Sequence, residues 1–165
     1  MPSLETRLRL LEFLAELCAI LAGALLTTVT LVTCASLVGR NTMGLTLAGD
    51  FELTGLVAGA AVALFMPLCQ FRQGNIIVDF FTAKAGARTN AALDRLGALA
   101  IAVIMGVLAW RTALGGASAY ASGSGTMILS LPEWATYAGM VPPLALTAAI
   151  ALSQAIAGFA EERAP

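Results

Sequence analysis

The stretch LCAILAGALLTTVTLVTCASLV, residues 17–38, contains no charged side chain and decides the fold of this chain. An α-helix needs about 20 consecutive, mostly apolar residues to cross the hydrocarbon core of a bilayer, and this stretch meets that length. Three similar stretches follow at residues 53–71, 96–114 and 134–160. The sequence therefore predicts an all-α membrane protein, a single membrane domain over residues 1–165, with transmembrane helices at approximately 14–38, 51–71, 94–114 and 134–160.

The third stretch is the weakest of the four. Its uninterrupted apolar part, residues 96–110, is short for a crossing, and Arg111 follows it directly. An arginine near the end of a span can extend its side chain toward the membrane surface, so that residues 112–114 complete the crossing. The run GGASAYASGSG at 115–125 is then expected to form a helix end or a loop outside the bilayer.

The overall composition agrees with a membrane protein. Hydrophobic residues make up 59% of the chain and charged residues 12%, and the mean hydropathy is +0.86. A body of this size cannot hide that much apolar surface from water, so lipid is the expected solvent. The net charge is −1, which leaves no basic field and excludes a nucleic-acid partner.

The basic residues indicate the orientation. If the N-terminus is cytoplasmic, seven of the nine Lys and Arg residues lie on that side and only Arg40 and Arg111 on the other. Cytoplasmic loops carry the excess of positive charge, so both termini are predicted to be cytoplasmic. Two short amphipathic segments, at about residues 3–13 and 75–88, are expected to lie along the membrane surface, the first as an entry helix that continues into the first span.

The residue types exclude several kinds of chemistry. The chain has no histidine, which removes histidine-ligated haem and zinc. The cysteines, at positions 18, 34 and 69, have no metal-binding spacing and read as small buried apolar residues. No nucleophile elbow, P-loop or metalloprotease motif is present. The prediction is a protein that is not an enzyme and binds no cofactor or metal.

Small and hydroxylated residues in the spans point to helix packing. Thr27, Thr28, Thr30, Thr33 and Ser36 are expected to bond back to their own helix or across to a neighbour. The alternative, a polar face lining a transport path, stays open. Gly55 and Gly59 form a GxxxG pair that permits close contact with another helix, in this chain or in a partner.

Four short motifs, in this order and spacing, carry a resemblance to a known family. They are Leu-Val-Gly-Arg at 37–40, Gly-Asp-Phe-Glu-Leu at 49–53, Phe-Arg-Gln-Gly-Asn-Ile-Ile-Val-Asp at 71–79 and Leu-Pro-Glu-Trp at 131–134. Across roughly residues 10–160 the chain resembles the small membrane (Q) subunit of tripartite ATP-independent periplasmic (TRAP) transporters. One departure is Asn75, which stands where the family often has histidine.

The resemblance implies a role in a bacterial inner membrane. It implies a small scaffold subunit that supports a large multi-spanning permease and helps to dock a periplasmic substrate-binding protein. In such a complex the permease takes up an organic anion, commonly a carboxylate, together with sodium. The residues expected at structural or partner contacts are Arg40, Asp50, Glu52, Arg72, Gly74, Asp79 and Trp134.

Two other classes of function remain open from the residues alone. A self-sufficient small transporter or channel, working as a homo-oligomer, needs a carboxylate within the membrane, and Glu16 is the candidate for it. A membrane anchor for a redox complex without haem ligands is the second alternative.

Overall fold

The computed structural model describes residues 4–44, 48–72 and 87–157. Four helices account for nearly all of them: α1 (Leu4–Met43), α2 (Asp50–Phe71), α4 (Ala87–Ser122) and α5 (Glu133–Ala157). Each is long and apolar enough to cross a membrane, and none of the described residues belongs to a β-strand. The predicted all-α class with four such helices is confirmed.

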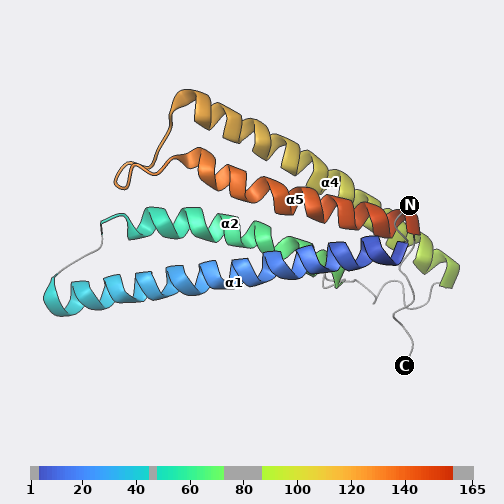
Figure 1. Cartoon of the computed structure of the whole chain (residues 1–165), viewed down its shortest axis with the longest axis horizontal. Coiled ribbons are helices and arrows are strands. Elements are labelled where there is room, and N and C mark those ends of the chain that lie inside the picture. Colours follow the sequence, from blue (N-terminus) through green and yellow to red (C-terminus); the bar gives the residue numbers. More distant parts are fainter. Residues whose placement is uncertain (1–3, 45–47, 73–86, 158–165) are drawn as a thin grey trace.

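The helices form two hairpins that lie side by side. Helix α1 packs against α2, α4 packs against α5, and α2 packs against α5. The helices therefore follow one another in the order α1, α2, α5, α4 (Figure 1). We call the contact between α2 and α5 the seam, because it joins the two hairpins.

The two ends of this row differ. The start of α1 and the end of α5 lie at one end (Figure 1), which we call the terminal end. The connection between α4 and α5, residues 123–132, lies at the opposite end, the connection end. An even number of crossings places both described chain ends on the same side of the row.

The core consists mainly of small side chains. Large buried residues are few, among them Leu144 and Ile150, and many large apolar residues face outward. In lipid, apolar side chains gain little by leaving their solvent, so helices associate where small residues let the backbones approach closely. The buried alanines are Ala15, Ala22, Ala61, Ala63, Ala98, Ala102, Ala109, Ala119 and Ala151.

Helix boundaries match the expected ones at the start of α1 and depart from them in α4. Helix α1 runs without a break from Leu4, as expected of an entry helix over 3–13 that continues into the first apolar stretch. Helix α4 continues to Ser122, through residues expected to end it. The second surface segment, 75–88, falls almost entirely outside the described residues, and its last two residues belong to α4.

The extended part of α4 packs closely against α5. A Cβ atom on Gly116 would lie 2.9 Å from Cβ of Tyr137, and one on Gly115 would lie 3.3 Å from the tyrosine ring. The two glycines therefore let α5 come close to α4. A helix within a membrane must also satisfy its own backbone hydrogen bonds, which favours continuing the helix over opening it.

The cysteines correct one expectation. Cys34 and Cys69 are exposed, and Cys18 is half-buried, although all three were expected to be buried. In a membrane protein the outer surface is as apolar as the interior, so an apolar run does not tell the two apart.

Candidate functional site

The α4–α5 connection is a short, ordered turn. Gly125 and Pro132 form an isolated antiparallel bridge, and the amide of Thr126 donates to the carbonyl of Leu131 at 3.0 Å. The amide of Ser130 closes the turn by donating to the Thr126 carbonyl, also at 3.0 Å. Met127, at the tip, is 97% exposed. The connection therefore presents an apolar tip beyond the helix ends.

Glu52 holds this turn from the other hairpin. One carboxylate oxygen accepts the backbone N–H of Ile128 at 3.1 Å, and the other accepts that of Leu129 at 3.1 Å. Glu52 lies in the first turn of α2, so the contact crosses the seam. A carboxylate is a strong acceptor, and two converging amides fix its position. We call this contact the glutamate clamp.

Gly49 adds a steric contact at the same place. It directly precedes α2, with φ of 86°, in the left-handed region that glycine adopts without strain. It is buried, and a Cβ atom there would lie 2.5 Å from Cγ of Leu129. The start of α2 and the α4–α5 connection thus meet closely only because position 49 has no side chain.

Asp50 contributes to the contact between α1 and α2. The hydroxyl of Ser36 donates to its carboxylate at 2.6 Å, which ties α1 to α2. One turn deeper, the hydroxyls of Thr33 and Thr54 lie 3.2 Å apart. These contacts support helix packing as the role of the hydroxyl groups. The remaining threonines of the set, Thr27, Thr28 and Thr30, donate to carbonyls four residues earlier in α1.

An amide pair joins the two hairpins at the terminal end. Nε2 of Gln70 donates to Oε1 of Gln154 at 2.7 Å, and Nε2 of Gln154 donates to the backbone carbonyl of Gln70 at 3.1 Å. Gln70 is only 5% exposed. We call this contact the glutamine clamp. The seam therefore has polar contacts at both ends, with apolar packing between them.

Arg72 and Glu16 lie near the glutamine clamp and form an ion pair. Nη2 of Arg72 lies 3.6 Å from Oε1 of Glu16, and the two side chains are 67% and 47% exposed. An exposed pair at this distance contributes little stability. It does supply a counter-charge to Glu16, the carboxylate that a self-sufficient channel would need deep in the membrane.

The middle of the seam is apolar. Ala63, Leu144 and Ala109 form a buried cluster with Met105 and Met140 packed against it. Gly59 faces the same region, where a Cβ atom would lie 3.8 Å from Cε of Met140. Gly55 is exposed, with no atom near its Cβ position. Of the GxxxG pair, only Gly59 takes part in packing between the described helices.

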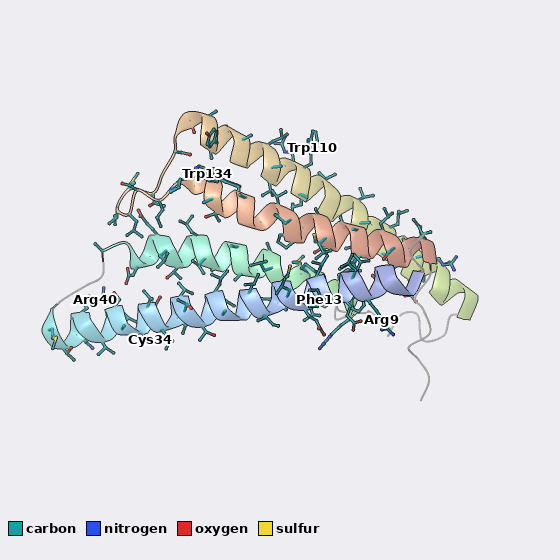
Figure 2. The ribbon with its side chains drawn as sticks, viewed as in Figure 1. Arg9, Phe13, Cys34, Arg40, Trp110 and Trp134 are labelled. Atoms are coloured by element: carbon teal, nitrogen blue, oxygen red, sulfur yellow. The ribbon has the colours of Figure 1, made fainter. Side chains whose placement is uncertain are left out.

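The aromatic residues at the connection end line an open groove between α4 and α5. Tyr120, Trp134 and Tyr137 contribute to it, and none of its lining residues is charged. The rings of Tyr120 and Trp134 meet edge to face with centroids 5.9 Å apart. Figure 2 shows Trp134 at the start of α5. The groove thus offers no charged group to an organic anion, and Trp134 stands where membrane-surface anchors are usual.

The other predicted site residues are scattered. Arg40 is exposed in the last turn of α1 (Figure 2). Gly74 and Asp79 lie outside the described residues. Among the residues that are described, no group of three or more His, Cys, Asp or Glu could hold a metal ion.

Sequence reasoning missed the glutamine clamp. Gln70 and Gln154 are neutral, so they do not stand out among the charged residues at the ends of the spans. A side-chain amide within an apolar run nevertheless indicates a polar contact between helices. Their 84-residue separation gives no hint that they meet. The role of Glu52 in holding the α4–α5 connection was equally hidden.

Comparison with known proteins gives one match. The family model described as "Tripartite ATP-independent periplasmic transporters, DctQ component" matches residues 29–161. The match includes all of α2, α4 and α5 and the connection-end part of α1. No curated protein and no solved structure matches the chain.

Proposed function

Since the chain belongs to the family of the DctQ component of tripartite ATP-independent periplasmic transporters, we propose that it is the small scaffold subunit of such a transporter. It supports a large multi-spanning permease in the bacterial inner membrane and helps a periplasmic substrate-binding protein to dock. The permease carries an organic anion, with a carboxylate as the expected class, together with sodium. The family is one of transporter components and not of enzymes.

The single observation that carries the proposal is the family match over residues 29–161. The contacts support a scaffold in particular. The glutamate and glutamine clamps fasten the seam at both ends, and the middle of the seam is apolar. A transport path normally needs polar or ionisable groups at mid-depth inside the protein, whereas this interior offers packing. The moving, substrate-carrying part is therefore assigned to the large subunit.

The proposed orientation places the connection end in the periplasm. This follows from the distribution of basic residues, which favours cytoplasmic termini. The residues available to a periplasmic partner are then Arg40, which is exposed, and the apolar tip at Met127. Glu52 affects docking through the turn that it holds, because both of its oxygens already accept hydrogen bonds.

The alternatives have no comparable observation in their favour. Glu16 lies at the terminal end beside Arg72, where a carboxylate does not serve as a mid-membrane ion site. A redox anchor is disfavoured by membership of a transporter family.

The first test is affinity purification of the tagged chain from its own detergent-solubilised membranes, followed by mass spectrometry. We expect a large multi-spanning protein in stoichiometric amount. A chain that purifies alone, as a stable homo-oligomer, would refute the scaffold role. Docking is tested separately with Glu52→Lys, which should weaken capture of the binding protein because the turn loses the two hydrogen bonds that hold it. The matched control is Glu133→Lys, in the first turn of the neighbouring hairpin's α5.

A further inference from the structure

Arg111 lies on the face of α4 that no described helix covers. The buried positions of α4 that face α5 are Ala98, Ala102, Ala109 and Ala119, spaced by four, seven and ten residues, as steps of three and four along one stripe give. Arg111 is two residues beyond Ala109 and therefore about 200° around the helix from it. It is exposed, as are Ile104 and Val107 on the same outward stripe. Neighbouring Trp110 projects away from α5 (Figure 2).

The packing also fixes the depth of Arg111. Ala109 belongs to the cluster formed with Ala63 and Leu144. Ala63 lies eleven residues after Glu52 and nine before Arg72, so it sits at the middle of α2. Leu144 likewise lies eleven residues after Glu133 and ten before Gln154. Arg111 is only about 3 Å further along α4 than Ala109.

This depth leaves the guanidinium far from water. Half of the hydrocarbon core is about 15 Å, which is more than an arginine side chain can span. The expectation that Arg111 reaches the membrane surface assumed that α4 ends near residue 114, and the continuation to Ser122 removes that assumption. A lone cation facing lipid at this depth is costly, so such residues generally face a protein partner.

Arg111 finds no counter-charge among the residues that the structure describes. No hydrogen bond or ion pair involves it there. A second copy of the chain would not help, because the described carboxylates in the spans and connections lie toward one or other end of the row. These carboxylates are Glu12, Glu16, Asp50, Glu52, Asp94 and Glu133. Lipid phosphates lie at the surface and are equally out of reach.

We propose that the outward face of α4 around Arg111 is the surface that binds the large permease subunit, and that Arg111 pairs there with an aspartate or glutamate in a membrane-spanning helix of that subunit. This rests on the proposed function. A guanidinium forms two parallel hydrogen bonds with a carboxylate, which fixes both the depth and the rotation of one helix against another. The outward stripe of apolar residues around it supplies the remaining contact.

The test uses the intact transporter in native membranes. A photoreactive amino acid is placed at Val107, 57% exposed on the α4 face, and separately at Leu31, 65% exposed on α1. We expect crosslinks to the large subunit from position 107 and not from position 31. In parallel, Arg111→Leu should lower recovery of the large subunit about tenfold, and Arg111→Lys should lower it less. The control is Arg95→Leu, which removes an exposed arginine near the start of the same span and should lower recovery less than about twofold.

The outcomes separate this inference from the proposed function. If the unaltered chain recovers the large subunit but Arg111→Leu recovers equal amounts, or the crosslinks come from position 31 alone, the α4 surface is wrong and the scaffold role stands. Crosslinks only to lipid or to a second copy also overturn the surface. If the unaltered chain recovers no large subunit, the scaffold role itself fails. Arg111→Leu makes membrane insertion easier, so equal membrane levels of both chains confirm that lost recovery reflects lost pairing.

Discussion

The glutamine clamp allows a quantitative test of how the two hairpins are joined. Replacing Gln154 by methionine conserves its volume and removes both hydrogen bonds to Gln70: the one at 2.7 Å between the two side-chain amides and the one at 3.1 Å to the Gln70 backbone carbonyl. An interhelical hydrogen bond in a membrane bundle contributes about 0.6 kcal/mol on average, so the two together contribute about 1 kcal/mol. A buried amide that loses its acceptor adds a penalty of about 1–3 kcal/mol. We expect Gln154→Met to lower the free energy of unfolding by roughly 2–4 kcal/mol.

The assay is reversible unfolding in mixed detergent micelles titrated with SDS, followed by circular dichroism, on Gln70→Met, Gln154→Met and the double variant. The double variant should lose less than the sum of the two single losses, by about 1 kcal/mol, because the penalty of an orphaned amide disappears when both are replaced. Ser153→Ala is the matched control, since its hydroxyl donates within α5, to Ile150, at 2.7 Å. If the two single losses add within about 0.3 kcal/mol, the two amides do not interact and the clamp is refuted.

Three further predictions concern the other contacts. Glu52→Ala should speed hydrogen exchange at the amides of Ile128 and Leu129 about tenfold, while other amides of the same turn change little; equal exchange in both chains would contradict the glutamate clamp. Gly49→Ala should lower the free energy of unfolding by about 1–3 kcal/mol, and adding Leu129→Ala should restore only the steric part, because the positive φ remains strained. Glu16→Gln should change stability by less than about 0.5 kcal/mol in the same SDS titration, since its ion pair is exposed; a larger loss would indicate a buried role.

The all-α class and the family could be predicted from local sequence patterns. Apolar runs such as 17–38 and 53–71 each have about the length of a crossing and contain no charge, so membrane thickness alone predicts their conformation. The family resemblance rested on four short motifs in order, and the family match over 29–161 confirms it. The helix ends were harder to predict. Gly115 and Gly116 are typical of a helix terminus, and the sequence does not reveal their close approach to Tyr137.

Only part of the candidate site could be predicted from the sequence. Asp50 and Glu52 were both expected at contacts, but their partners Ser36, Ile128 and Leu129 depend on which hairpins lie side by side. The pattern of hydrophobic residues could not predict which hairpins lie side by side. In lipid the outward and inward faces of a helix are similarly apolar, so periodicity carries little information about which face meets a neighbour.

The sequence by itself determined the solvent, the number of crossing helices and the family of this protein, because each of these follows from the length, charge and order of local segments. Tertiary structure decided that α2 and α5 form the seam, that the two clamps close it, and that Arg111 faces outward close to the level of the cluster of Ala63, Ala109 and Leu144. These facts depend on helix rotation and on the relative depth of segments distant in the chain. Both are set by the close approach of small residues such as Gly49, Ala63 and Gly116, and no local segment records them.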